Sequence, residues 1–310
     1  MPRRHCCDVV SGHDRERPAW PVTAGRIGPA LPDNRRGAMR SRAVWFRSSL
    51  FWPLHAPLLL LAVLTVMFRV SDADIEICRW LYEHGHHPGW RTPSALLHCL
   101  YEYGPLPALA LGIGGMAIGI LGTFWQRLRP YREAGFFLAA MLALGPGLIV
   151  NGVFKPYWQR PRPLQTLAFG GSEPFVPVWE LGASPHCKSF PSGHASMGFY
   201  LLAPAFLCHR RRRLALTFVA VGLAGGLLVG AGRVMQGAHY PSDVVWSAGM
   251  VYLSGLVLFG MFQLAKSAGQ RAADSARASP EPALVLLRFP GSDRNRVTKP
   301  AAAEPPRRAA

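Results

Sequence analysis

Charged residues are scarce in this sequence. Asp, Glu, Lys and Arg make up 16% of the 310 residues, whereas 50% are hydrophobic. A soluble domain carries about 25% charged residues. The composition therefore disfavours a soluble globular protein and favours an integral membrane protein with long apolar segments.

Acidic residues are also few, and cysteines are scattered. The chain has 34 Lys and Arg against 17 Asp and Glu, which gives a formal net charge of +17. The basic residues cluster in the tails and in short turns, without an aromatic stacking surface, so we predict no nucleic-acid binding. No CxxC pair occurs, which disfavours a zinc site. We predict no metal site and no cofactor. Cys78 and Cys99 fall in one expected outer loop and form either a disulfide or two free thiols.

The ends of the chain differ from its middle. Residues 1–48 are rich in Arg, Pro and Gly without apolar periodicity, and residues 266–310 are rich in Ala, Pro and Arg. Both are predicted to be disordered, the second as a flexible cytoplasmic tail. Met39 begins a stretch typical of the start of a membrane protein, so residues 1–38 are either a dispensable tail or an extension before the natural start.

The middle, residues 49–265, is predicted to be an all-α membrane domain. The length of each apolar segment is close to the roughly 20 residues that a bilayer-spanning helix needs. The six expected transmembrane helices are 49–70, 104–125, 134–154, 194–208, 214–231 and 243–265. The fourth is short, and we expect its N-terminal end to extend above the hydrocarbon.

The arginines predict the orientation of these helices, because positive charge concentrates in cytoplasmic loops. With six helices, four basic groups share one side: Arg40, Arg42 and Arg47; Arg127, Arg129 and Arg132; Arg210 to Arg213; and Lys266. Loop 71–103 on the other side is rich in acids. We therefore expect both termini in the cytoplasm and, for a Gram-negative bacterium, an inner-membrane protein whose outer face meets the periplasm.

Three polar motifs lie on that outer face. They are Lys155 to Pro163 with Arg162, Pro191-Ser192-Gly193-His194, and Arg233 with His239 and Asp243. The positive-inside rule would not place Lys155, Arg162 and Arg233 there, so we interpret them as anion ligands. Arg160 is either a further contact to the anion or a contact to lipid headgroups.

The second and third motifs add a helix end and two imidazoles. Ser192 and Gly193 fall where a loop becomes a helix, and helix N-termini bind phosphate through free N–H groups. Asp243 is expected to fix the tautomer of His239, which leaves one ring nitrogen free to attack phosphorus. His194 has no acidic partner close in sequence and is expected to protonate the leaving oxygen.

The three motifs resemble the signature of the type 2 phosphatidic acid phosphatase (PAP2) superfamily. Its pattern is Lys-x6-Arg-Pro, Pro-Ser-Gly-His and Ser-Arg-x5-His-x3-Asp. The chain departs from it once, because Gly232 replaces the serine before Arg233. With the six-helix layout, the resemblance covers residues 49–265 and implies a PAP2-like helical bundle.

The resemblance implies a metal-independent lipid phosphatase. His239 would form a phosphohistidine, and His194 would protonate the departing alcohol. The phosphate would be held by Lys155, Arg162, Ser192, Gly193, His194 and Arg233. The implied partner is a phosphorylated membrane lipid: lipid A, undecaprenyl diphosphate, phosphatidylglycerophosphate or phosphatidate. Loop 71–103 loosely resembles that of lipid A phosphatase-like members, and no oligomeric state is implied.

Three alternatives remain open at this point. Another lipid could accept the phosphoryl group in place of water, which would make the protein a lipid phosphotransferase. A non-catalytic lipid-binding or lipid-transport protein would need no polarised nucleophile, which disfavours it. Vanadate-dependent haloperoxidases resemble the same site, but they are soluble, which the apolar segments disfavour.

Overall fold

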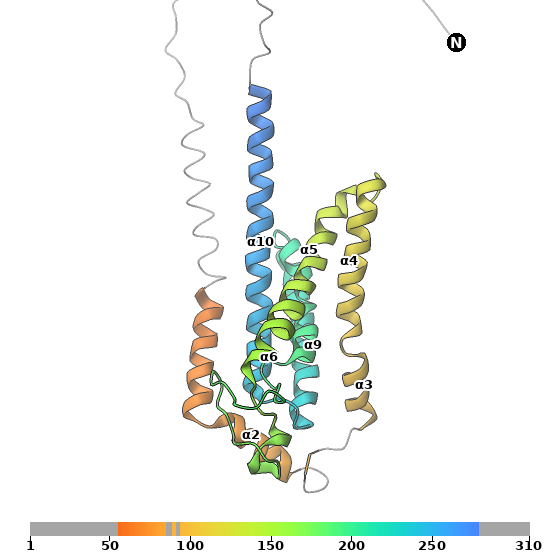
Figure 1. The fold of residues 1–310 in the computed structure, drawn as a ribbon. Helices are drawn as coiled ribbons and strands as arrows, with labels where there is room; N and C mark the ends of the chain where they lie inside the picture. The colour runs from red at the N-terminus through yellow and green to blue at the C-terminus, as the bar shows by residue number, and fades with distance from the viewer. Residues whose placement is uncertain (1–54, 85–88, 91–93, 279–310) are drawn as a thin grey trace, which may run out of the picture. The chain divides into compact units, whose positions relative to one another are not determined.

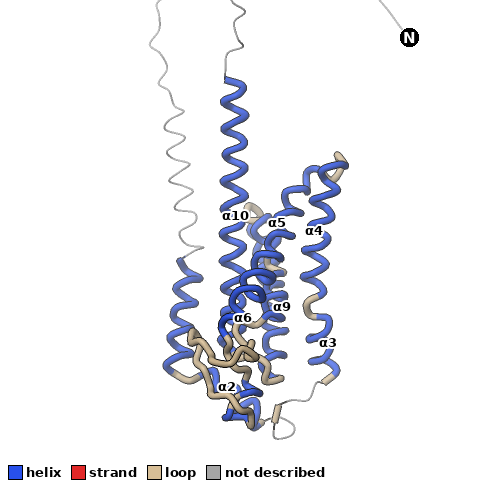
Figure 2. Tube along the Cα trace, viewed as in Figure 1, coloured by secondary structure: helices blue, strands red, loops and turns tan. Residues whose placement is uncertain are grey.

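A computed structural model describes residues 55–84, 89–90 and 94–278 (Figure 1). The chain divides into two units, 1–53 and 54–310. The predictions for residues 1–48, including the start at Met39, lie outside the described residues. Among the residues described, the elements are helices, and the pairing of Thr166 with Glu173 is an isolated bridge (Figure 2). The predicted all-α class is confirmed for this part of the chain.

The helices of the second unit follow one another in a simple order. After the helix His55–Val70, they are α2 (Ala73–Glu83), α3 (Ala95–Tyr103), α4 (Leu106–Phe124), the 3-10 turn η1 (Arg129–Tyr131), α5 (Arg132–Leu142), the π-helical η2 (Ala143–Phe154), α6 (Lys155–Trp158), the 3-10 turns η3 (Pro163–Gln165) and η4 (Leu167–Phe169), α7 (Gly193–Tyr200), α8 (Ala203–Leu207), α9 (Arg212–Met235) and α10 (Pro241–Ala278). Loop 170–192 joins η4 to α7.

Four helical stretches in the described residues are long and apolar enough to cross a membrane. They are Ala95–Phe124, Arg129–Gln165, Arg212–Met235 and Pro241–Arg277, and His55–Val70 is a shorter apolar helix. The protein is therefore a multi-pass membrane protein. The expected fourth span, 194–208, is broken between α7 and α8, where most of α7 is buried. A broken helix is tolerated at membrane depth when other helices surround it.

Small residues bring the helices of the bundle close together. α4 packs along α5, where a Cβ added to Gly135 would lie 2.4 Å from the carbonyl oxygen of Gly115. α7 packs along α9 in the same way. Contacts of this kind let backbones approach where the hydrophobic effect between helices is weak. Behind them, a buried cluster that includes Phe137, Phe199 and Val251 forms the core.

The C-terminal helix and the cysteines differ from the predictions in detail. α10 continues past residue 265 to Ala278, where a flexible tail was predicted; residues 279–310 lie outside the described part. The polar residues of its last turns are compatible with a helix that leaves the bilayer. Cys78 is buried and Cys99 exposed, and both are free thiols, so the disulfide alternative is wrong.

Candidate active site

The three polar motifs meet at the end of the bundle where α6 ends, α7 and α10 begin, and α9 ends (Figure 1). A Cβ added to Gly193 of the second motif would lie 3.0 Å from Nζ of Lys155 in the first. The charges of Lys155 and Arg233 both act on His239 of the third motif. Helices far apart in sequence thus gather the predicted residues around one site.

The ring of His239 is held by a backbone carbonyl. Its Nδ1 lies 2.7 Å from the carbonyl oxygen of Ser189, and the side chain is buried. Because a carbonyl can only accept a hydrogen bond, Nδ1 carries the proton and Nε2 keeps its lone pair. The prediction that Asp243 fixes this tautomer needs correction, because its Oδ2 lies 3.6 Å from Nδ1, beyond hydrogen-bond distance.

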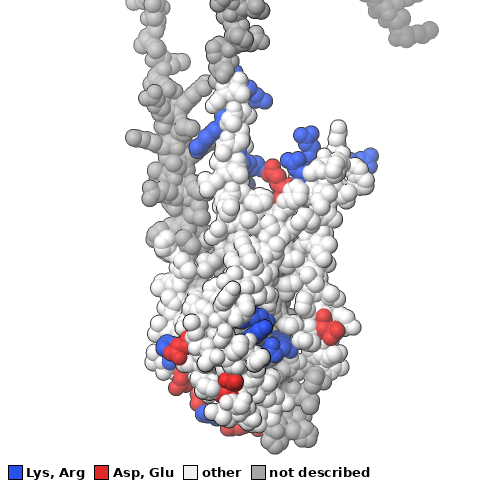
Figure 3. All heavy atoms as spheres, in the orientation of Figure 1, with Lys and Arg blue, Asp and Glu red and all other residues white. Residues whose placement is uncertain are grey.

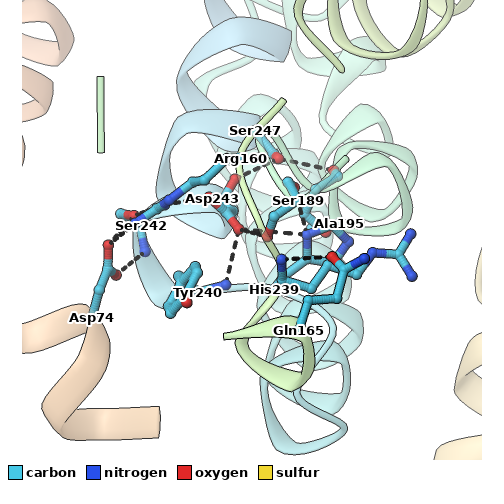
Figure 4. Close-up of polar contacts among 12 residues, drawn as sticks. Asp74, Arg160, Gln165, Ser189, Ala195, His239, Tyr240, Ser242, Asp243 and Ser247 are labelled. Carbon is cyan, nitrogen blue, oxygen red and sulfur yellow. Dashed lines mark hydrogen bonds and ion pairs between the residues drawn. The ribbon is translucent and has the colours of Figure 1, made fainter. Parts of the chain in front are cut away.

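Asp243 instead holds two segments that adjoin His239, one at Ser189 and one at Tyr240. Its Oδ2 accepts hydrogen bonds from Ser189 Oγ at 2.5 Å and from the backbone N–H of Tyr240 at 2.9 Å. These contacts fix the residue that orients His239 and the residue that follows it (Figure 4). Asp243 therefore positions His239 indirectly, with Ser189 between them.

Burial sets the protonation state of His239. It lowers the pKa of the imidazole below its ordinary value, and the charges of Lys155 and Arg233 add to this lowering. The carboxylate of Asp243 opposes it and raises the pKa. A lowered pKa keeps the imidazole neutral, which is the form that can attack phosphorus.

Arg160 does not face the site, which corrects both predicted roles for it. Its guanidinium is fully buried and donates from Nη1 to Asp243 Oδ1 at 2.6 Å and from Nη2 to Asp74 Oδ2 at 2.8 Å. Nε donates to the carbonyl oxygen of Val176, and Nη1 also contacts Ser242 Oγ. With its donors used in this way, Arg160 joins α2, loop 170–192 and α10 (Figure 4).

The N-terminus of α7 lines the site. Ser192 is the N-cap, and its Oγ accepts from the backbone N–H of Ala195. Gly193 faces Lys155 and Asn151, since an added Cβ would lie 2.5 Å from Asn151 Oδ1. The helix end and the ammonium group of Lys155 together suit a phosphate.

Arg233 and His194 lie against the ring of Tyr101. The Arg233 guanidinium carbon is 4.6 Å from the ring centroid, and the imidazole of His194 stacks on the ring at 4.8 Å. Nη1 of Arg233 donates to Gln236 Oε1, and its Nε is buried without a hydrogen-bond partner among the described residues. Arg162 is half-buried, and its charge acts on Lys155 and Arg233.

No motif or spacing in the sequence pointed to Tyr101, Asp74, Ser189 or Asn151 as parts of this site. Asn151 donates from Nδ2 to the carbonyl oxygen of Pro146, and its Oδ1 faces Gly193. Asp74 lies in loop 71–103, and the loose resemblance of that loop to lipid A phosphatase-like members gave Asp74 no role in the site. Within the described ranges, no three His, Cys, Asp or Glu side chains lie together as a possible metal site.

Part of this region is similar to a known protein family. Residues 134–267 match the family model of the PAP2 superfamily. The match contains all three motifs, so the resemblance drawn from them is confirmed. Tyr101 and Asp74 lie outside the matched residues.

A curated relative of this chain is the lipid A 4'-phosphatase of Francisella tularensis subsp. novicida (strain U112). It is 42% identical over 133 residues, which are 42% of this chain and 59% of the relative. The chain thus covers about three fifths of that protein. The crystal structure of a transmembrane PAP2 type phosphatidylglycerolphosphate phosphatase from Bacillus subtilis is similar with a TM-score of 0.42 and 19% identity, covering 70% of this chain and 98% of that one.

Proposed function

We propose that this protein is a membrane lipid phosphatase in which His239 is the nucleophile. The observation that carries the proposal is the contact of 2.7 Å between His239 Nδ1 and the Ser189 carbonyl oxygen. It leaves Nε2 unprotonated in a site that three cations surround. Such a nitrogen is suited to attack a phosphorus atom, as nucleophilic catalysis requires.

The reaction has two steps. In the first, the bond from Nε2 of His239 to phosphorus forms while the bond from phosphorus to the lipid oxygen breaks. His194 gives its proton to that oxygen, and the lipid alcohol leaves. In the second, water attacks the phosphohistidine, His194 takes a proton from the water, and inorganic phosphate departs.

Positive groups stabilise the charge that develops on the phosphoryl oxygens. Lys155, Arg162 and Arg233 supply formal charge, and the N-terminus of α7 at Ser192 and Gly193 supplies backbone N–H groups. These groups take the role that a metal ion has in other phosphatases, so the proposed reaction is metal-independent.

We place this site on the periplasmic side of a bacterial inner membrane, with six spans and both termini in the cytoplasm. The far ends of α4, α5 and α10 carry mostly Lys and Arg side chains, whereas the end with α2 and α6 carries Asp and Glu as well as Lys and Arg (Figure 3). Positive charge of this kind marks the cytoplasmic side. In this arrangement, His55–Val70 and the broken pair α7 and α8 join the four long helical stretches as spans.

The proposed substrate is a lipid that carries a phosphomonoester or diphosphate. Lipid A is the first candidate, because the curated relative that matches the domain is a lipid A 4'-phosphatase. Fold and site chemistry do not select one lipid by themselves. Undecaprenyl diphosphate, phosphatidylglycerophosphate and phosphatidate are therefore compared with it directly.

The test is phosphate release by purified protein in detergent, with EDTA present, from each of these four lipids. We expect release from at least one lipid, and none by the His239→Ala variant, which should remain folded. Acid-labile radiolabel trapped on the wild-type protein and absent from the variant would support the phosphohistidine. Release that needs an added metal, or that survives in His239→Ala, would sink the mechanism.

A further inference from the structure

Tyr101 is the one described aromatic residue whose ring contacts both His194 and Arg233. The imidazole plane of His194 is inclined by 26° to the ring, with centroids 4.8 Å apart. The Arg233 guanidinium carbon lies 4.6 Å from the same centroid. Tyr101 lies on α3, outside the PAP2 superfamily match, so the family motifs do not account for it.

α3 holds Arg233 by a second route. Nη1 of Arg233 donates to Gln236 Oε1, and Gln236 Nε2 lies 3.5 Å from the carbonyl oxygen of Leu97 on α3. The helix is itself anchored, because Ser94 caps its first turn and Leu97 is buried. A ring contact and a side-chain bridge thus tie the end of α9 to α3.

We propose that Tyr101 is a positioning residue that sets the proton donor His194 and the phosphate ligand Arg233 in one arrangement. The inference rests on the proposed function. When His194 is protonated, it carries the same charge as Arg233, and the two cations repel each other. The electron-rich face of an aromatic ring attracts both ions and favours their approach.

The ring also limits the motion of the two side chains. Arginine has a long side chain with many rotamers. When its guanidinium stacks on an aromatic ring, fewer of these rotamers are available, so the guanidinium keeps its contacts more of the time. Nε of Arg233 is buried beside this stack and, in the described part of the chain, has no hydrogen-bond partner. A phosphate oxygen is a suitable acceptor for it. Tyr101 thereby aims one donor at the phosphate and another at the leaving oxygen.

The experiment compares Tyr101→Leu, Tyr101→Phe and the matched control Tyr103→Leu on the same helix. Tyr103 is exposed, and its ring contacts neither His194 nor Arg233. Two substrates are used, dilauroyl phosphatidate and p-nitrophenyl phosphate. The alkoxide that leaves phosphatidate needs a proton, whereas nitrophenolate leaves without one, so the ratio of their kcat/KM values reports on His194.

We expect Tyr101→Leu to lower kcat/KM for phosphatidate by about 10-fold or more, and for p-nitrophenyl phosphate by clearly less. Tyr101→Phe keeps the ring and should restore most of the loss. Orthovanadate, measured by its thermal stabilisation of the protein, should bind more weakly to Tyr101→Leu, because Arg233 is less well placed. The thermal midpoint without vanadate checks that the variants are folded.

An unchanged substrate ratio in Tyr101→Leu would overturn the proposal, as would an equal loss in Tyr103→Leu or in Tyr101→Phe. Failure of the proposed function looks different, because the wild-type protein would then release phosphate from none of the four lipids of the proposed function. In that case, orthovanadate binding still tests whether Tyr101 positions Arg233. Weaker binding to Tyr101→Leu supports the positioning of Arg233, and unchanged binding contradicts it.

Discussion

The guanidinium of Arg160 and the carboxylate of Asp243 form a fully buried ion pair, with 2.6 Å between Nη1 and Oδ1. Arg160 pairs at the same time with Asp74 on α2, at 2.8 Å. Asp243 in turn accepts from Ser189, whose carbonyl oxygen holds His239. The position of His239 therefore depends on a charge network that starts outside the family motifs.

Removal of Arg160 should destabilise the protein strongly. Arg160→Met leaves Asp74 and Asp243 buried without their cation, and breaking such a pair costs about 3–5 kcal/mol. Unfolding by SDS in mixed micelles measures the loss. Arg79→Met is the matched control, because Arg79 pairs with Glu76 on the surface, and such pairs contribute little. Equal stability of the two variants would contradict the structural role of Arg160.

The pH dependence of kcat/KM should show an acid limb from His239. The pKa of this imidazole is lowered by burial, so the neutral, reactive form persists below the ordinary histidine pKa and activity falls only as the pH drops further. Asp243 raises that pKa, so Asp243→Asn should move the limb to lower pH. Ionisation of the substrate is common to both proteins and cancels in the comparison. A limb that moves to higher pH would contradict the electrostatic assignment.

Gly193→Ala should reduce activity without unfolding the protein. The added Cβ would lie 2.5 Å from Asn151 Oδ1 and 3.0 Å from Lys155 Nζ, and both of these side-chain ends can move. Their movement displaces a phosphate ligand, and we expect a loss of about 10-fold or more in kcat/KM, as for other displaced charge-stabilising groups. Gly260→Ala is the control, since no atom lies within 4 Å of its added Cβ. Equal activity of the two variants would remove Gly193 from the site.

Gly232→Ser restores the hydroxyl that the PAP2 pattern has before Arg233. Here a Cβ would lie 3.4 Å from Leu97 Cδ2 and 3.7 Å from Leu100 Cδ1, which are ordinary contacts. The variant should fold, with a thermal midpoint no lower than that of the wild type, because glycine is a poor residue inside a helix. We expect kcat/KM to stay within about threefold, since the ionic contacts to phosphate are unchanged. A large increase would show that the serine has a catalytic role which this chain lacks.

The sequence predicted the residues of the site better than their contacts. Lys155, Gly193, Arg233 and His239 were all expected at one phosphate site, and the structure brings them together because each motif lies at the start or the end of a helix on the same side of the bundle. The contacts of Arg160 and Asp243 were interpreted wrongly. Spacing in the sequence makes Asp243 a neighbour of His239. It does not show that Arg160 and Ser189 donate hydrogen bonds to the carboxylate oxygens of Asp243.

The sequence by itself determined the class of the protein, the apolar segments and the identity of the motif residues, because hydrophobicity and spacing are local properties of a chain. The tertiary structure alone decided the tautomer of His239, the burial of Arg160 and the stacking of Tyr101 on His194 and Arg233. Each of these depends on atoms from helices far apart in sequence. Only packing brings such atoms within the few ångströms over which hydrogen bonds and ring contacts act.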